Sequence, residues 1–306
     1  MRLAETDVVV RDVTLRDGLQ DAAPIDTDAK RAIFDALVAA GIRDLELTSF
    51  VRADVIPALA DAEVLAAATA GAGVTRWALA LNLRGAQRAL AAGLRHLQYV
   101  VSVSDTHSRH NARQSTADAL AGLGDVVASA RAEGAVVEVT LATAFGCPYE
   151  LRVPVAAVVA AAERATGLGA AALSLADTIG VATPPEVTAL VTAVQGATGL
   201  PVGAHLHDTR GLAIANALAA IDAGAVHIDG SVGGLGGCPF APGASGNLPL
   251  EDLVHALDAM GVRTGASVDG LIGAARLACA AVGRPVASHV GVAGPRFVPR
   301  ADQPSS

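Results

Sequence analysis

Four stretches of this 306-residue chain share one pattern, and that pattern decides the fold. They are AAGIRDLELTSF (residues 39–50), AAGLRHLQYVVSVS (91–104), AEGAVVEVTLAT (132–143) and DAGAVHIDGSV (222–232). Each joins the end of a helical segment to a short strand that contains β-branched residues. The glycine at each junction suits the left-handed backbone position that often ends a helix. The pattern predicts a repeated helix–strand unit.

The same unit can be followed along the whole chain and predicts eight strands. They are expected near residues 8–15, 42–48, 75–81, 96–103, 136–142, 171–176, 201–206 and 226–232. Helical patterns separate them, as in residues 183–199, where Thr183 is the expected cap and Pro184 lies in the first turn. Apolar strands that alternate strictly with helices form a parallel sheet, and eight such units in about 240 residues match a closed (β/α)₈ TIM barrel. An open doubly wound sheet is the alternative, but no Gly-x-Gly-x-x-Gly turn opens the first helix.

Length alone allows one large domain or two ordinary ones, and the eight repeated units favour a single α/β domain over residues 1–306. We expect the barrel to span about residues 7–250, and two further helices with a Gly/Pro-rich tail to extend it over about 251–306. The chain is 52% hydrophobic and carries a net charge of −8, with no basic stripe that would bind nucleic acid. No apolar run approaches the roughly 18 residues of a membrane span, and the N-terminus lacks the core of a signal peptide. We therefore expect a cytoplasmic protein that binds neither membranes nor nucleic acid.

Lysine and cysteine usage narrows the chemistry. Lys30 is the only lysine, and it falls in an amphipathic helix that Thr27 is expected to cap, on the predicted outer face. Schiff-base aldolases and pyridoxal-phosphate enzymes need a lysine in the active site, so carbanion chemistry here requires a metal or another electron sink. Cys147, Cys238 and Cys279 form an odd set without metal-knuckle spacing, which argues against a disulfide framework.

Polar residues gather where the predicted strands end, which is where barrel enzymes place their chemistry. They are Arg16-Asp17-Gly18 after the first strand, Glu46 and Thr48 in the second, Asp177-Thr178 after the sixth, and His205-Leu206-His207-Asp208 after the seventh. His205 and His207 are two apart and so share a face of their strand, and Asp17, from a neighbouring strand of the ring, can add a carboxylate. A nitrogen–oxygen site without thiolate suits Mg²⁺ or Mn²⁺, with Zn²⁺ and Co²⁺ as competitors. A hydrogen-bonded pair of core histidines is the alternative interpretation.

Two further residues allow more than one interpretation. Arg16 can clamp a carbonyl oxygen that turns into an enolate, or it can pair with Glu46 or Asp177, and an ion pair would orient the clamp. Cys238 lies in the glycine-rich segment 233–247, where a thiol can exchange a proton with a carbanion. A small buried hydrophobic residue is the alternative, as for most free cysteines.

Six motifs resemble those of the 3-hydroxy-3-methylglutaryl-CoA lyase family. They are RDGLQ (16–20), LTSFV (47–51), GCPYE (146–150), DTIGV (177–181), HLHDT (205–209) and GLGGCPFAPGASGNL (234–248). The resemblance implies a divalent cation, an acyl-CoA substrate and a homodimer. It implies that the metal ligands are Asp17, His205, His207 and Asn247. It also implies a catalytic set of Arg16, Cys238, Asp17, His205, Glu46 and Asp177, in which Cys238 transfers a proton.

By this resemblance the chain is expected to cleave 3-hydroxy-3-methylglutaryl-CoA, or a closely related 3-hydroxyacyl-CoA, to acetyl-CoA and a keto acid. The sequence leaves the general base open between Asp17 and His205, and departures such as Asp21-Ala22-Ala23 after RDGLQ leave the acyl group open. Three alternatives are a condensing synthase of the isopropylmalate or citramalate type, an aldolase for 4-hydroxy-2-oxo acids, and a non-catalytic barrel. Synthases of this superfamily typically read Gly-Glu-Arg-x-Gly-Asn after the last strand, whereas this chain has Gly243-Ala244-Ser245-Gly246-Asn247.

Overall fold

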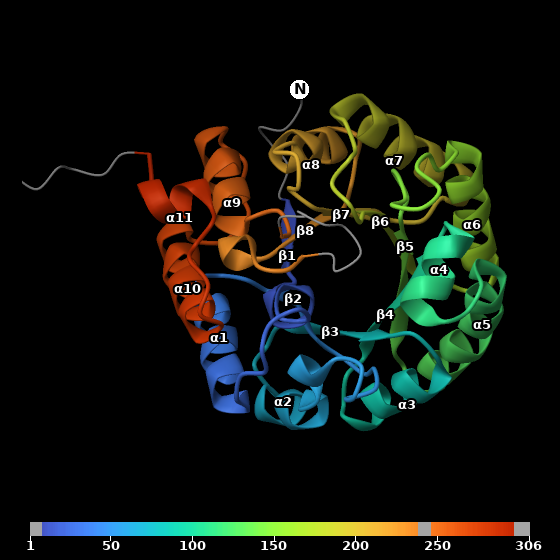
Figure 1. Ribbon diagram of the computed structural model, residues 1–306, viewed down its shortest axis with the longest axis horizontal. Helices are drawn as coiled ribbons and strands as arrows, with labels where there is room; N and C mark the ends of the chain where they lie inside the picture. The colour runs from blue at the N-terminus through green and yellow to red at the C-terminus, as the bar shows by residue number, and fades with distance from the viewer. Residues whose placement is uncertain (1–7, 238–245, 297–306) are drawn as a thin grey trace, which may run out of the picture.

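The computed structural model describes residues 8–237 and 246–296, and within them the chain folds into a closed barrel of eight parallel strands (Figure 1). The strands are β1 (Val9–Asp12), β2 (Asp44–Ser49), β3 (Thr75–Ala80), β4 (His96–Ser102), β5 (Val136–Ala142), β6 (Ala172–Asp177), β7 (Val202–Leu206) and β8 (His227–Gly230). They stand in chain order around the ring, and β1 pairs with both β2 and β8. The predicted TIM barrel is confirmed, and the open doubly wound sheet was the wrong alternative.

Helices surround the ring and separate consecutive strands, as Figure 1 shows. They are α1 (Thr27–Ala39), α2 (Ala62–Ala68), α3 (Leu83–Ala91), α4 (Asp105–Ala112), α5 (Thr116–Ala132), α6 (Val155–Gly167), α7 (Pro184–Thr198), α8 (Ala213–Asp222) and α9 (Leu250–Ala259). The glycines of the repeated unit close helices with positive φ, as predicted: 99° at Gly41, 83° at Gly93, 65° at Gly134 and 95° at Gly224. No helix among the described residues has both the length and the apolar character needed to cross a membrane.

Strand side chains alternate between the helical layer and the barrel interior, as β4 illustrates. Leu97, Tyr99 and Val101 point outward into the main hydrophobic core, where the Tyr99 hydroxyl donates to the carbonyl of Ala119 on α5 at 2.8 Å. Gln98 points inward and its amide nitrogen lies 3.4 Å from a Glu138 carboxylate oxygen. The interior of this barrel therefore holds polar side chains, while its apolar core lies between sheet and helices.

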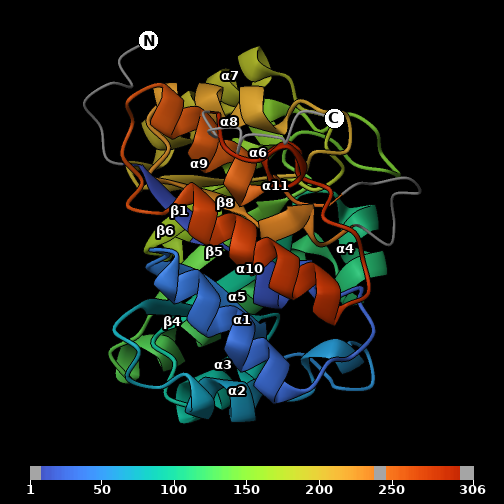
Figure 2. The ribbon, with the colours of Figure 1, turned by 90° about the vertical axis from the view of Figure 1, so that its left-hand side faces the viewer.

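The chain continues past α9 with α10 (Val268–Ala281) and α11 (His289–Ala293), so the described residues beyond 249 form three helices where two were predicted. Figure 2 shows α10 lying along α1, so a helix from near the start of the chain packs against one from near its end. Cys279 is buried in α10. Burial raises the pKa of this thiol to about 11, so it stays protonated near neutral pH.

The first strand is shorter than predicted. It ends at Asp12 because the Asp12 carboxylate accepts hydrogen bonds from the Thr14 backbone nitrogen (2.9 Å) and the Thr14 hydroxyl (2.7 Å). The chain then forms a π-helical turn over Thr14–Gly18, so Arg16 and Asp17 project from a turn and not from the strand. The Thr14 hydroxyl also accepts from the backbone nitrogen of Val232 at 2.9 Å, which ties this turn to the segment after β8.

Two predictions about the first helix were wrong. Its cap is Asp26, whose side chain accepts from the Ala29 backbone nitrogen at 2.6 Å, because α1 begins at Thr27 itself. Lys30 is buried between α1 and the segment that leads into α2, where its ammonium donates to the Ala58 carbonyl (2.6 Å) and pairs with Asp61. This ion pair occupies Lys30 outside the barrel, so the conclusion that it does not act as a Schiff-base lysine is unchanged.

Candidate active site

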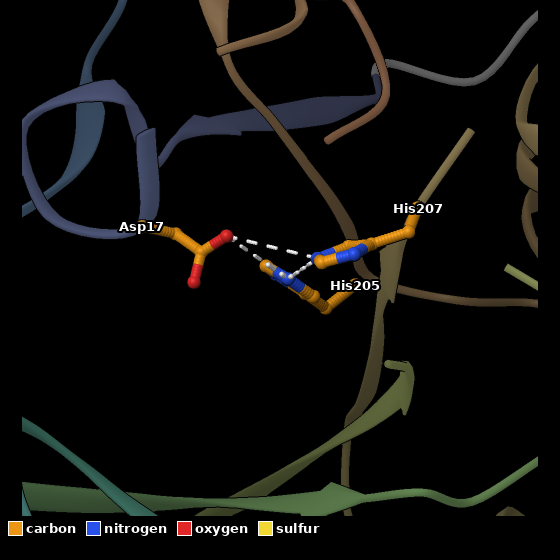
Figure 3. A group of neighbouring side chains, drawn as sticks. All are labelled: Asp17, His205 and His207. Atoms are coloured by element: carbon orange, nitrogen blue, oxygen red, sulfur yellow. Dashed lines mark hydrogen bonds and ion pairs between the residues drawn. The ribbon is translucent and has the colours of Figure 1, made fainter. Parts of the chain in front are cut away.

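A carboxylate and two imidazoles meet at the end of the barrel where the strands terminate (Figure 3). Asp17 comes from the π-helical turn after β1, and His205 and His207 come from the end of β7. All three are buried, and Figure 3 shows the Asp17 carboxylate pointing toward both rings. The prediction that Asp17 comes from a strand next to β7 was wrong, since β8 stands between β1 and β7. The turn after β1 carries Asp17 across that gap.

The spacing of these groups fits a single divalent cation. Nε2 of His205 and Nε2 of His207 lie 3.2 Å apart, and Oδ2 of Asp17 lies 3.6 Å from Nε2 of His207 and 4.0 Å from Nε2 of His205. Adjacent ligands of an octahedral ion with bonds of about 2.1 Å lie about 3 Å apart, so small movements would bring all three atoms onto one ion. A mixed set of imidazole and carboxylate donors is compatible with Mg²⁺, Mn²⁺ or Zn²⁺.

Asn247 supplies a fourth polar group beside this triad. Its side-chain nitrogen donates to Oδ2 of Asp17 (2.7 Å) and to the Leu235 carbonyl (3.0 Å), and its backbone bridges to that of His207. Its side-chain oxygen is buried and has no hydrogen-bond partner among the described residues. An unpaired buried carbonyl oxygen is costly. This oxygen is the kind of ligand that Mg²⁺ and Mn²⁺ accept, so the donor set fits a metal better than it fits a core of paired histidines.

Asp17 is held as a carboxylate by its neighbours. Its Oδ1 accepts from Arg16 at 2.5 Å and from the Gln20 amide at 2.9 Å, which leaves Oδ2 to face Asn247 and the imidazoles. Burial by itself raises the pKa of Asp17, but the Arg16 cation and the two histidines outweigh it and hold the pKa well below the ordinary range. An ionised carboxylate with one oxygen engaged and the other directed inward is prepared to bind a cation.

Arg16 joins Asp17 to Glu46, which confirms the predicted ion pair with Glu46. One guanidinium nitrogen binds Asp17, and the other lies 2.6 Å from a carboxylate oxygen of the fully buried Glu46. Burial lowers the pKa of Arg16, but Glu46 and Asp17 raise it above the ordinary value, so the cation persists. Burial raises the pKa of Glu46, and Arg16 offsets this only in part. Arg16 also lines the cavity next to the triad, so the ion pairs hold its guanidinium at the cavity wall.

Asp177 has a different environment from the one predicted. Its two carboxylate oxygens accept from the backbone nitrogens of Val181 and Ala182, each at 2.9 Å, and so hold the turn that follows β6. It is not among the described residues that line the cavity, whereas the adjacent Thr178 is. The geometry gives Asp177 a part in shaping the cavity wall, and its predicted catalytic role stays a prediction.

A cavity of about 590 Å³ opens beside the triad and is lined by polar groups to which the sequence analysis gave no role. Ser49 at the end of β2 and Thr140 on β5 line it, and both hydroxyls are buried without a hydrogen-bond partner among the described residues. Gln20, which binds Asp17, lines it as well. Ser49 and Gln20 lie within the motifs LTSFV and RDGLQ, but inward positions cannot be separated from outward ones without the closed ring, and for Thr140 alternation along β5 was the available signal.

Cys147 and Cys279 are not among the described residues that line the cavity. Cys147 is buried and its thiol lies 3.0 Å from the Ser104 hydroxyl, beyond the residues that line the cavity among those described. Cys238, the predicted proton donor, lies outside the described residues, which resume at Gly246. Gly237, the last described residue before it, lines the cavity.

Comparison with known proteins agrees with this geometry. The family model described as HMGL-like matches residues 7–277. The chain belongs to the HMGL-like family. It is 39% identical to hydroxymethylglutaryl-CoA lyase of Bacillus subtilis, over 92% of this chain and 95% of that protein. It is also 39% identical to (R)-citramalyl-CoA lyase of Chloroflexus aurantiacus, over 95% of this chain and 96% of that protein.

A solved structure of an HMG-CoA lyase from Acinetobacter baumannii, in complex with coenzyme A and 3-methylmalate, is also similar to this member of the HMGL-like family. The two chains are 36% identical, with a TM-score of 0.92 over 97% of this chain and 98% of that one. The barrel and its C-terminal helices are therefore shared along nearly the whole length. The resemblance inferred from the six motifs is confirmed at the level of the family.

The triad generates the first prediction. The wild-type protein should bind one divalent cation, and EDTA should abolish its activity until Mg²⁺ or Mn²⁺ is restored. His207→Gln should weaken Mn²⁺ binding by more than the roughly 10–100-fold that changes outside the ligand shell cause, because it removes a direct ligand. Isothermal titration of metal-free protein measures this. His110→Gln, which changes an exposed histidine on α4, should bind Mn²⁺ normally. Full turnover by verified metal-free protein would contradict the prediction.

Proposed function

We propose that this chain is a metal-dependent carbon–carbon lyase that cleaves 3-hydroxy-3-methylglutaryl-CoA, or a close 3-hydroxyacyl-CoA, into acetyl-CoA and a keto acid. One observation carries the proposal: the Asp17, His205 and His207 triad lies beside the Arg16 cation on the wall of one cavity. Membership of the HMGL-like family, whose relatives named above are lyases of acyl-CoA substrates, supports the reaction class.

Asp17, His205, His207 and Asn247 hold the cation in this proposal. A divalent cation held there would lower the pKa of the substrate alcohol, so that a base could take its proton near neutral pH. Asp17 and His205 are the candidate bases. Removal of that proton lets the alcohol carbon become a ketone as the adjacent carbon–carbon bond breaks, and the bonding electrons pass to the thioester as an enolate.

Arg16 and Cys238 act on that enolate. The Arg16 guanidinium, oriented by Asp17 and Glu46, donates hydrogen bonds to the oxygen where negative charge develops. The Cys238 thiol then gives its proton to the enolate carbon, which yields acetyl-CoA and leaves a thiolate to be reprotonated. Ser49 and Thr140 have unpaired hydroxyls on the cavity wall, so they are suited to contact the acyl group.

A second candidate substrate is citramalyl-CoA. The citramalyl-CoA lyase and the hydroxymethylglutaryl-CoA lyase are equally identical to this chain, at 39%. Both thioesters carry a tertiary alcohol at the same distance from the thioester, so the same catalytic groups serve either substrate. Cleavage of citramalyl-CoA releases pyruvate and acetyl-CoA, and cleavage of 3-hydroxy-3-methylglutaryl-CoA releases acetoacetate and acetyl-CoA.

The proposal extends to the protein as a whole. Residues 1–306 act as one lyase domain, Mg²⁺ or Mn²⁺ is the working ion, and the protein is a cytoplasmic homodimer. The family resemblance supports the ion and the homodimer. In this proposal the protein does not bind nucleic acid, because its net charge is −8 and its basic residues are scattered along the sequence.

Product analysis tests the function directly. With Mg²⁺ or Mn²⁺, purified protein should release acetyl-CoA from one of the two thioesters, together with acetoacetate or pyruvate, as followed by liquid chromatography. It should not liberate free CoA from acetyl-CoA and a 2-oxo acid, which is the reaction of a condensing synthase. Free CoA in that second assay alone would establish a synthase. Turnover of a free 4-hydroxy-2-oxo acid alone would establish an aldolase.

Arg16→Gln should retain the metal and lower kcat by roughly 10²–10³, because it removes the cation that stabilises the developing enolate. Metal content and kcat are measured on the same preparation, so loss of the ligand set is distinguished from loss of the clamp. Arg210→Gln is the matched control, since Arg210 binds backbone carbonyls of the turn at residues 179–180 and does not line the cavity among the described residues. Turnover of Arg16→Gln within a few-fold of wild type would reduce Arg16 to an ion-pair partner.

Cys238→Ala should fold, bind Mn²⁺ and lose on the order of 10²–10⁴ in kcat, because the enolate loses its proton donor. Alkylation by iodoacetamide should inactivate the wild type, and substrate should slow the inactivation. The other two thiols are internal controls: Cys147→Ala and Cys279→Ala should stay comparatively active. An active Cys238→Ala enzyme would assign the proton to another group.

A further inference from the structure

The metal site has a second layer on the inner side of His205. Nδ1 of His205 lies 3.2 Å from Oδ2 of Asp229, a residue of β8 that no motif of the family resemblance includes. Asp229 is completely buried. The opposite ring nitrogen, Nε2, is the one that faces His207 and Asp17. The imidazole is therefore held between a carboxylate on one side and the proposed cation site on the other.

Asp229 is in turn anchored by a buried cluster of charges inside the barrel. Its other oxygen, Oδ1, lies 3.5 Å from Nε2 of His227 and 3.9 Å from a guanidinium nitrogen of Arg11. Arg11 donates to both oxygens of Glu138, at 2.6 and 3.2 Å, and to Asp44 at 2.8 Å. We call Asp229, His227, Arg11 and Glu138 the interior cluster. Its members come from β8, β1 and β5, so barrel closure assembles it.

A glycine provides the space that the cluster needs. Gly203 precedes His205 by two residues on β7 and so faces the interior on the same side. A Cβ atom at Gly203 would lie 2.0–2.6 Å from three atoms of the His227 ring, which no packing tolerates. The His227 ring thus occupies the position of a side chain from β7. The interior cluster is a packed arrangement directly beneath His205.

Stability alone does not explain these charges. Arg11, Glu138 and Asp229 are at most 2% exposed, and removing charged groups from water costs several kcal/mol per ion before pairing offsets it. An apolar interior of similar volume is often as stable or more stable. A cluster of this kind that ends on one nitrogen of a metal-binding histidine points instead to control of that histidine.

We propose that Asp229 is a positioning residue for the metal centre, accepting the Nδ1 proton of His205 so that the Nε2 lone pair faces the cation. His227, Arg11 and Glu138 hold the Asp229 carboxylate in place. The inference rests on the metal site of the proposed function. It also has a consequence for that function: with both ring nitrogens engaged, His205 is a ligand and not the general base. Partners of this kind fix the tautomer of a ligand and strengthen its bond to the metal.

Asp229→Asn tests the proposal because it keeps the size of the side chain and removes its charge. Titration of metal-free protein with Mn²⁺ should show affinity weakened by about 10–100-fold. Saturating Mn²⁺ should restore most of kcat, as expected of a residue that acts through the metal. Asp252→Asn is the matched control, a buried carboxylate outside the barrel that binds the backbone of Val290 at 2.7 Å, and its Mn²⁺ affinity should be that of the wild type.

A second measurement needs no variant, so it decides the matter even if Asp229→Asn fails to fold. In ¹⁵N-histidine-labelled wild type loaded with diamagnetic Mg²⁺, the His205 signals should show a protonated Nδ1 and an unprotonated Nε2. The reverse tautomer, or an unchanged Mn²⁺ affinity in a folded Asp229→Asn protein, would overturn the inference and leave the lyase proposal intact. Absence of Mn²⁺ binding by the wild type would instead contradict the proposed function itself.

Discussion

Closure of the barrel is the constraint on which the rest of this structure depends. The pairing of β1 with β8 joins the two ends of the sheet and brings the turn after β1 to the same mouth as the end of β7. Without it, Asp17 and His205 would have no reason to meet. Closure also creates an enclosed interior whose width is set by eight strands, and side chains from opposite strands come within hydrogen-bond distance there. The proposed metal centre is the upper layer of that interior.

The interior is polar because each charge in it has a partner. Arg16 lies between Asp17 and Glu46, while Arg11 lies between Glu138 and Asp44 with its guanidinium 4.3 Å from the centre of the Trp77 ring. Burial would make any one of these groups costly by itself. Removal of a single partner would leave an unpaired charge in the barrel. The proposed metal centre and the interior cluster beneath it therefore depend on each other. His205 belongs to both layers, through Nε2 and Nδ1.

Local sequence patterns predicted the bounds of most strands. β5 was predicted at its exact bounds and most other strands to within about two residues, because period-two apolar runs bounded by a helix-ending glycine are local signals. The first strand was predicted too long, since Asp12 bends the chain through hydrogen bonds to Thr14 that apolar patterning does not reveal. Lys30 was misplaced for a related reason. Its partner Asp61 lies far along the chain, and a lysine on a helix is usually exposed.

The sequence by itself determined the order of strands and helices, the closed parallel architecture, and the residue types that gather at the strand ends. It determined these because glycine conformation, strand alternation and motif wording act over a few neighbouring residues. Only the tertiary structure decided which of those residues share a site. It brought Gln20, Ser49 and Thr140 to the cavity and placed Asp229 behind His205. It directed the Asp177 carboxylate into a turn. These outcomes depend on distances between strands that are remote in sequence, and such distances exist only after the barrel has closed.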